Sequence, residues 1–407
     1  MPAREDLLAI YAAALKKVNG RHCVSEALSL NSFTDKVIVV AIGKAASSMA
    51  QGACDALGDK ITEGLLITKT GHGTTLPNFT CIESGHPLPD ENSLLAGQAL
   101  LDLLQRSSTD AQFLFLISGG ASALVEVLPE GLNADDLQRI NNTLLSSGLD
   151  IQRMNRVRTA VSEIKGGRLA KYVSNRRTLC LLISDVIGDD PAVIGSGLLV
   201  KPATSLLDLA DITLPPWLTS LTSLASSQPS SNDSCFDKIE TKILASIKDA
   251  CQAAANEAEK LGYDVFHHQD LFCCDAESTA KRLATQLLES NPGLHIWGGE
   301  TTVELPDKVG RGGRNQHLAL AAAEVIAGHS DCWLLAAGTD GSDGPTSDAG
   351  GLVDGGSTDR MQLHQINSHE ALQRFDAGTA LEVSGDLITT GPTGTNIMDI
   401  VLGLKGL

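Results

Sequence analysis

Five short apolar segments, each followed by a polar or glycine-rich loop, constrain the fold of this chain more than any other feature. They are Lys36–Ile42, Gly64–Thr68, Phe113–Ile117, Leu179–Ile183 and Cys332–Ala337. Their apolar residues run without alternation, which is typical of strands buried on both faces. Helical patterns lie between these segments, at Ala45–Leu57, Asn92–Leu104 and His317–Ala327. The order of strands and helices therefore predicts an α/β protein with parallel sheets.

The length and one serine-rich segment suggest how the chain divides. At roughly 150 residues per domain, 407 residues correspond to two or three domains. Residues Thr219–Ser234 contain seven serines and Pro229 but no lysine or arginine, which favours a linker over a solvated loop at a helix end. We predict two domains, at residues 1–228 and 229–407, each with a mainly parallel sheet flanked by helices. We expect Ile239–Leu261 to be helical, and the last helix is a candidate to pack back on the first domain.

Composition excludes several classes of partner. The net charge of −18 disfavours nucleic acid or an anionic membrane, and an aromatic content of 3% leaves few platforms for stacking bases. No apolar run reaches the ~18 residues that a membrane helix needs, and Met1–Leu15 resembles a surface helix rather than a signal peptide. The nine cysteines lack a CxxC pair, and we interpret them all as reduced, with Cys180 and Cys332 in the core. We therefore expect a cytoplasmic protein.

The loops that follow the apolar segments are the first candidate site. In parallel sheets, ligands bind outside the carboxyl ends of the strands. For any one such loop, a turn or a helix cap explains the Gly and Asp residues equally well. Five such loops together favour a crevice that binds a ligand.

Glycine is concentrated late in the chain, with 13 of the 39 glycines between Gly298 and Gly356. Two blocks stand out there, Gly298–Thr302 with Gly310–Gln316, and Gly338–Thr346. Glycine lets backbone amides approach an anion closely, and Asp at such turns can hold Mg²⁺ or cap the next helix. We interpret Gly338–Thr346 as functional rather than structural.

A basic segment interrupts the acidic chain. Residues Arg153–Arg177 carry eight basic side chains and one acidic side chain, Glu163. Such a cluster suggests a locally positive electrostatic potential that attracts an anionic substrate, although a solvated helix face is the alternative. We favour the solvated face for Arg176 and Arg177. We favour a functional role for Arg158 and for the group Lys165–Arg168, whose glycines bring the backbone close.

Several known motifs are absent. Gly43-Lys44 follows a strand but lacks the earlier glycine of a Walker A loop, and Gly195–Val200 lacks the third glycine of a dinucleotide-binding fingerprint. There is no GxSxG nucleophile elbow, no HExxH or zinc-type spacing, and no protein-kinase motif.

Ten segments, in order along the chain, resemble one known family. They are Val40–Ala45, Lys69–His72, Ser84–Asp90, Ser118–Leu124, Asn155–Gly167, Ser184–Pro191, Gly298–Thr302, Gly312–Gln316, Gly338–Thr346 and Thr390–Asn396. Together they are similar to class II glycerate kinases, the family with a C-terminal MOFRL domain. One departure is Thr159-Ala160, where many members carry a basic pair, and this weakens any substrate role for those two positions.

The resemblance implies a kinase that uses ATP and Mg²⁺ to phosphorylate D-glycerate at its 2-hydroxyl. It also implies a Rossmann-like N-terminal domain, a MOFRL C-terminal domain, and a site in the cleft between them. The expected partners are glycerate and ATP, without nucleic acid or membrane, and a homodimer is one possible assembly.

The residue types at the strand ends fit phosphoryl transfer, which needs positioning and charge cancellation. The resemblance points to Lys44 and Arg314 as catalytic, and we add Asp185, at a strand end, as proton acceptor or Mg²⁺ ligand together with Asp189. The residues expected to bind nucleotide or phosphate are Gly43, Ser118, Gly119, Gly120, Gly338, Asp340, Gly341, Asp343 and Gly344. The residues expected to bind substrate are Ser122, Arg158, Lys165, Glu300 and Asn315.

Two other functions remain open at this point. One is an NAD(P)-dependent hydroxypyruvate reductase, a label that the family has sometimes carried, although the missing dinucleotide fingerprint speaks against it. The other is a non-catalytic sugar-acid binding protein, against which the lysine, arginine and aspartate residues at several strand ends argue.

Overall fold

The computed structural model describes residues 2–30, 33, 35–202, 208–305 and 308–406. By its internal contacts the chain forms two compact units, Gly20–Leu244 and Met1–Asn19 with Ala245–Leu407. We call them the N-terminal unit and the C-terminal unit. The serine-rich segment and the predicted boundary at 228/229 both lie inside the N-terminal unit. The division into domains at 228/229 stays a prediction.

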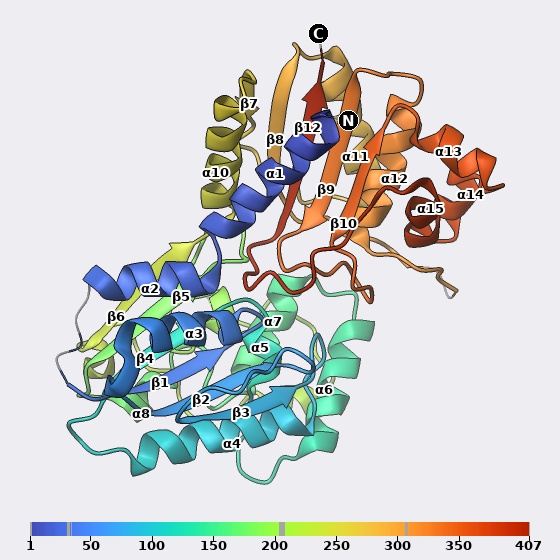
Figure 1. The fold of residues 1–407 in the computed structure, drawn as a ribbon. Helices are drawn as coiled ribbons and strands as arrows, with labels where there is room; N and C mark the ends of the chain where they lie inside the picture. Colours follow the sequence, from blue (N-terminus) through green and yellow to red (C-terminus); the bar gives the residue numbers. More distant parts are fainter. Residues whose placement is uncertain (1, 31–32, 34, 203–207, 306–307, 407) are drawn as a thin grey trace. The chain divides into compact units, whose positions relative to one another are not determined.

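The N-terminal unit is built on a six-stranded parallel sheet, as predicted, with the strand order β3-β2-β1-β4-β5-β6 (Figure 1). Its strands are β1 (Val37–Ile42), β2 (Ile61–Lys69), β3 (Phe79–Ser84), β4 (Gln112–Ile117), β5 (Thr178–Ile183) and β6 (Ile239–Ala245). The central strands β1, β4 and β5 are almost wholly buried, because helices cover both faces of the sheet.

Two groups of helices cover this sheet (Figure 1). Helix α3 (Ala46–Leu57) packs on β1 and β2, with α2 (Gly20–Leu30) against it. Helices α4 (Glu91–Arg106), α5 (Ala121–Leu124) and α8 (Ala170–Val173) pack in the core cluster that contains Phe113 and Phe115. Helices α6 (Ala134–Ser146), α7 (Ile151–Ala160) and α9 (Pro216–Leu221) share a smaller apolar cluster.

The C-terminal unit has a mixed sheet with the order β11-β10-β9-β12-β8-β7. Its strands are β7 (Val265–His267), β8 (Gly293–Gly299), β9 (Cys332–Gly338), β10 (Gly350–Asp354), β11 (Leu387–Ile388) and β12 (Asp399–Lys405). Only β7 and β8 pair in parallel among the described strands of this sheet. The prediction of a mainly parallel sheet is therefore wrong for this unit. Continuous apolar runs report burial on both faces but not strand direction, and β12 inserts antiparallel between β8 and β9.

Helices cover both faces of this second sheet (Figure 1). Helices α1 (Pro2–Lys17) and α10 (Ile247–Lys260) lie side by side on one face, and α11 (Ala276–Glu289) and α12 (Arg314–Ile326) pair on the other. Helices α13 (Ser357–Leu363) and α14 (Ser368–Gln373) precede the last helix, α15 (Ala377–Ser384). Helix α15 packs against α12, α13 and α14 of its own unit.

The segment Ile239–Leu261, expected to be helical, divides into strand β6 and helix α10. The reason is Ser246, whose side chain forms a capping box with Asp249 and so starts the helix after the strand. The first residues of the segment, Ile-Glu-Thr-Lys-Ile, are rich in β-branched side chains that favour a strand.

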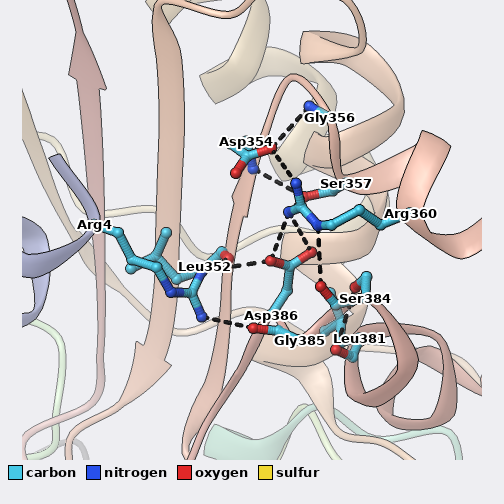
Figure 2. A network of polar contacts seen from close by, with 10 residues as sticks. All are labelled: Arg4, Leu352, Asp354, Gly356, Ser357, Arg360, Leu381, Ser384, Gly385 and Asp386. Carbon is cyan, nitrogen blue, oxygen red and sulfur yellow. Dashed lines mark hydrogen bonds and ion pairs between the residues drawn. The ribbon is translucent and has the colours of Figure 1, made fainter. Parts of the chain in front are cut away.

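Helix α1 is joined to the rest of the C-terminal unit by a charge network centred on the buried Asp386 (Figure 2). The Arg4 guanidinium donates to the carbonyl oxygens of Leu352 and Gly385, at 2.9 and 2.8 Å. It also reaches the buried Asp386 carboxylate, which accepts hydrogen bonds from Arg360 at 2.8 and 3.1 Å. Two cations thus stabilise one buried anion, which joins α1 to β10 and to the end of α15.

Two expectations about the whole chain can be compared with the structure. All nine cysteines are free thiols, and Cys180 and Cys332 are buried. Among the described residues, none of the helices combines the length and the apolar character needed to traverse a bilayer.

Candidate active site

The predicted site residues form two groups, one in each unit. The N-terminal group contains Gly43, Lys44, Ser118, Gly119, Gly120, Ser122, Arg158, Lys165, Asp185 and Asp189. The C-terminal group contains Glu300, Arg314, Asn315, Gly338, Asp340, Gly341, Asp343 and Gly344.

The loops after β1 and β4 are bound tightly to each other. The Lys44 amide donates to the Gly119 carbonyl oxygen at 2.9 Å, and the Ala45 amide donates to Ser118 Oγ at 3.0 Å. Gly43 has a φ of +132°, and a Cβ there would lie 2.2 Å from Ser118 Oγ. Only glycine fits this position, and the close approach fixes where Lys44 leaves the strand.

Lys44 shares its surroundings with a histidine that sequence reasoning missed. A Cβ built on Gly120 would lie 3.2 Å from Lys44 Cγ and 3.0 Å from His86 Cδ2, so both side chains border this glycine. His86 follows strand β3, and its signal in the sequence was its place in the segment Ser84–Asp90. A lysine and an imidazole beside a glycine-rich turn can bind the oxygens of a phosphate or a carboxylate.

Ser122 and Arg158 have different polar surroundings. The Ser122 hydroxyl lies 2.8 Å from the Ser196 hydroxyl. Arg158 donates from Nε to Asn141 Oδ1 at 3.2 Å and makes a longer contact, 3.4 Å, with Asn155 Oδ1. Burial lowers the pKa of the Arg158 guanidinium. A half-buried cation whose described contacts are to neutral amides can accept an anionic ligand at lower cost than one already paired with a carboxylate.

Lys165 is held in a buried ion pair. Its ammonium contacts the Glu126 carboxylate, which also accepts hydrogen bonds from Ser162 Oγ at 2.6 Å and from the Val127 amide at 3.0 Å. The Lys165 side chain is 1% exposed. Its charge is already matched in this structure, and its substrate role remains a prediction.

Asp185 and Asp189 lie in the turn that follows β5. The Asp189 amide donates to the Val186 carbonyl oxygen at 3.0 Å, and Asp189 adopts a φ of +54°. In the part of the chain that the structure describes, no cluster of three or more His, Cys, Asp or Glu side chains is arranged to hold a metal. The catalytic and metal roles of Asp185 and Asp189 therefore remain predictions.

Arg314 in the C-terminal group lies between two carboxylates. It begins helix α12, donates from Nη1 to Glu300 Oε1 at 2.7 Å, and places Nη2 3.6 Å from Asp399 Oδ2. Asp399 is the first residue of β12 and pairs in register with Gly299 and Gly338. Sequence reasoning missed Asp399, although an acidic residue at the start of an apolar strand was the available signal.

Asp343 caps helix α12. Its carboxylate accepts hydrogen bonds from the amides of Asn315 and Gln316, at 3.1 and 2.8 Å. A Cβ on Gly313 would lie 2.3 Å from Asp343 Cγ, so glycine is needed for this approach. Asp343 thus occupies the helix N-terminus, where a phosphate could otherwise bind.

The loop that begins at Gly338 is closed by its own polar groups. Asp340 Oδ1 accepts hydrogen bonds from the Ser342 amide at 2.9 Å and the Ser342 hydroxyl at 3.0 Å. Gly341 has a φ of +86°, and a Cβ there would lie 2.1 Å from the Gly391 carbonyl oxygen. Gly344, with a φ of +60°, lies against Gly313. The glycines therefore allow close backbone packing in this loop.

Burial raises the pKa values of both buried carboxyls in this group. The pKa of Asp343 rises to about 6 and that of Asp399 to about 7, because burial disfavours the charged form. The Arg314 guanidinium opposes both shifts but does not cancel them. Both groups therefore titrate within a pH range in which most carboxyls are already ionised.

We predict that Asp399→Asn changes how stability depends on pH. A carboxyl with a raised pKa in the folded protein stabilises the fold fully below its unfolded value, about 3.9, and loses that contribution as pH rises through about 7. Wild type should therefore lose up to about 1.4 kcal/mol per pH unit relative to Asp399→Asn across this range. Urea unfolding followed by tryptophan fluorescence, to which Trp297 and Trp333 of this unit contribute, measures the difference. A difference that does not change with pH would contradict the prediction.

Comparison with known proteins identifies both halves of the chain. Residues 6–215 match a family model described as a domain of unknown function, DUF4147. Residues 293–399 match the MOFRL family. The first range includes every N-terminal site residue, and the second includes every C-terminal one.

Three relatives match nearly the whole chain. A D-glycerate 2-kinase of Thermotoga maritima is 35% identical, with 91% of each chain covered. A glycerate 2-kinase of Pyrococcus horikoshii is 35% identical, with 91% of this chain and 87% of the relative covered. A putative hydroxypyruvate reductase of Agrobacterium vitis is 33% identical, with 90% of this chain and 98% of the relative covered.

The fold also matches a solved structure. The crystal structure of a glycerate kinase from Thermotoga maritima superposes with a TM-score of 0.85 at 34% identity, covering 99% of this chain and all of that one. The likeness of sequence and fold extends over both units. The chain therefore belongs to the DUF4147/MOFRL glycerate kinase family.

Proposed function

We propose that this protein is an ATP-dependent D-glycerate 2-kinase, which converts ATP and D-glycerate to ADP and 2-phosphoglycerate. The observation that carries the proposal is the match over 91% of both chains to a protein named D-glycerate 2-kinase. The geometry of the N-terminal group supports it, because Lys44 and His86 border a glycine-rich turn suited to an anion.

Phosphoryl transfer asks the protein for positioning and for cancellation of developing charge. Lys44, at the end of β1, would neutralise the moving phosphoryl group as a compact cation. Arg158 would bind the glycerate carboxylate, since its described contacts are to amide oxygens. Arg314 would add a planar pair of donors for a second anionic group.

The resident metal of such a reaction would be Mg²⁺, which offsets the charge of the ATP phosphates when it is bound. Mg²⁺ is usually held by one or two carboxylates together with phosphate oxygens and water. Asp185 and Asp189 supply two carboxylates in one turn, which fits this requirement. We propose Asp185, two residues after the end of β5, as the group that accepts the hydroxyl proton.

Phosphorus NMR of the products tests the proposed function. With ATP, Mg²⁺ and D-glycerate, the purified protein should give 2-phosphoglycerate rather than 3-phosphoglycerate. L-glycerate in a parallel reaction tests the stereoisomer. Glycerate binding without any phosphorylated product would instead indicate a sugar-acid binding protein.

One observation favours a second candidate function, an NAD(P)-dependent hydroxypyruvate reductase. Two relatives from Agrobacterium vitis, 33% and 34% identical, carry the name putative hydroxypyruvate reductase. Loss of nicotinamide absorbance during incubation with hydroxypyruvate would support that function. We expect no such loss, because the chain has no dinucleotide fingerprint.

A further inference from the structure

Tyr11 links the first helix of the chain to the strand end that opens the loop Gly338–Gly344. Its hydroxyl donates a hydrogen bond of 2.7 Å to the Gly338 carbonyl oxygen, and the side chain is 2% exposed. The same carbonyl oxygen has a longer contact, 3.4 Å, with the Gly341 amide. Without the phenol, the long contact from the Gly341 amide would be the remaining hydrogen bond to this buried oxygen, which would then be poorly satisfied.

A second contact from the same end of the chain reaches the same region. Asn19 Nδ2 donates to the Thr393 carbonyl oxygen at 2.9 Å, and the Thr393 hydroxyl donates to the Thr339 carbonyl oxygen. The Thr339 hydroxyl in turn donates to the Met398 carbonyl oxygen at 2.6 Å and accepts from the Ile397 amide at 3.0 Å. These bonds connect the start of the chain to the residues just before Asp399.

Asp399 is the residue through which this network meets Arg314. It pairs in register with Gly338, and its Oδ2 lies 3.6 Å from Arg314 Nη2. A shift of the Gly338 strand end would therefore move the carboxylate that helps to orient the guanidinium. Burial, with the nearby charges of Asp340 and Asp399, raises the pKa of Tyr11, so the phenol remains a donor at neutral pH.

We propose that Tyr11 is a positioning residue for the glycerate kinase reaction: from helix α1 it holds the Gly338 strand end, and thereby Asp399 and Arg314, in the arrangement that turnover requires. Asn19 supports the same arrangement through Thr393. The proposal rests on the proposed function and goes beyond it, because it assigns part of the site's construction to a helix outside both glycine-rich blocks.

Helix α1 provides a matched control for the test. Tyr263 donates its hydroxyl to Asp6 Oδ2 at 2.5 Å, so it also joins α1 to the C-terminal unit by one phenolic hydrogen bond. Tyr263→Phe and Tyr11→Phe each remove such a bond, but only the bond of Tyr11 ends at Gly338. A general loosening of α1 would affect both variants.

Steady-state kinetics and thermal melting of the full chain are the first measurements. We expect Tyr11→Phe to lower kcat/KM for glycerate phosphorylation about five- to tenfold, as the loss of one buried hydrogen bond would. Tyr263→Phe should stay within about twofold of wild type, even if both variants melt a few degrees earlier. Equal losses of activity in the two variants, or wild-type kinetics in Tyr11→Phe, would overturn the proposal.

Amide hydrogen exchange provides a readout that does not depend on the reaction. Residues 338–344 and 391–398 should exchange faster in Tyr11→Phe and at the wild-type rate in Tyr263→Phe. If wild type is inactive on glycerate, the proposed function is refuted, and hydrogen exchange alone then decides whether Tyr11 holds this region.

If Tyr11→Phe does not fold, Asn19→Ala, which alters a half-buried side chain, is measured in the same way. Unchanged exchange in a folded variant overturns the proposal.

Discussion

Lys44→Ala should phosphorylate glycerate at least about 100-fold more slowly than wild type, as the loss of one charged group that stabilises a transition state typically does. The Lys44 backbone is hydrogen-bonded to Gly119, and the first part of its side chain borders Gly120, so the residue is positioned beside the glycine-rich turn. Alanine preserves the backbone hydrogen bond to Gly119 and removes the ammonium together with its aliphatic stem. The loss should appear mainly in kcat, because charge on the phosphoryl group develops in the transition state.

A discontinuous assay for 2-phosphoglycerate measures this effect. Lys260→Ala is the matched control, since it removes a lysine from an exposed pair with Glu257 on helix α10. We expect the control to retain activity within about twofold, because exposed ion pairs contribute little. Full activity in a folded Lys44→Ala protein would remove Lys44 from the mechanism.

Arg314→Ala should also lower kcat by at least about 100-fold. The guanidinium is held by Glu300 on one side and Asp399 on the other, with about a third of the side chain exposed (34%). Alanine removes the donors and leaves the buried Asp399 without its neighbouring cation. Arg314→Lys should recover little activity, because a point charge cannot replace a planar fork with two partners.

Arg311 provides the control for Arg314. It lies three residues earlier and forms ion pairs with Asp348 and Glu382, with 40% of its side chain exposed. Arg311→Ala should lose some stability but keep kcat within a few fold of wild type. Thermal melting measures the loss of stability separately from the loss of kcat. A folded Arg314→Ala protein with normal turnover would refute the catalytic role of Arg314.

The difference between the two sheets shows what hydrophobic patterning can predict. Runs such as Phe113–Ile117 and Cys332–Ala337 were recognised as buried strands, and both are strands in the structure. Patterning reports burial, and the helices that cover a sheet bury parallel and antiparallel strands alike. The direction of strands in the C-terminal unit depends on the insertion of Asp399–Lys405 between β8 and β9, a pairing between residues far apart in the sequence.

The sequence offers candidate site residues but not the contacts between their side chains. Strand ends are visible in the sequence, so Lys44, Ser118 and Gly338 could be identified as candidates. The pairing of side chains is not visible: Glu126 lies far from Lys165 in the sequence but neutralises it, and Asp343 caps a helix that begins well before it. Tyr11 carried no signal at all, because an aromatic residue in an amphipathic helix is usually only a core residue.

The placement of helix α1 in the C-terminal unit imposes an order on biosynthesis. The helix is translated before the N-terminal unit, but β9 and β12, the strands on which it packs, are translated after that unit. At about 5–20 residues per second, α1 waits for roughly 20–80 s with its apolar face uncovered while the N-terminal unit is made and can fold. The order of translation therefore makes the C-terminal unit, which contains α1, the later of the two units to be completed.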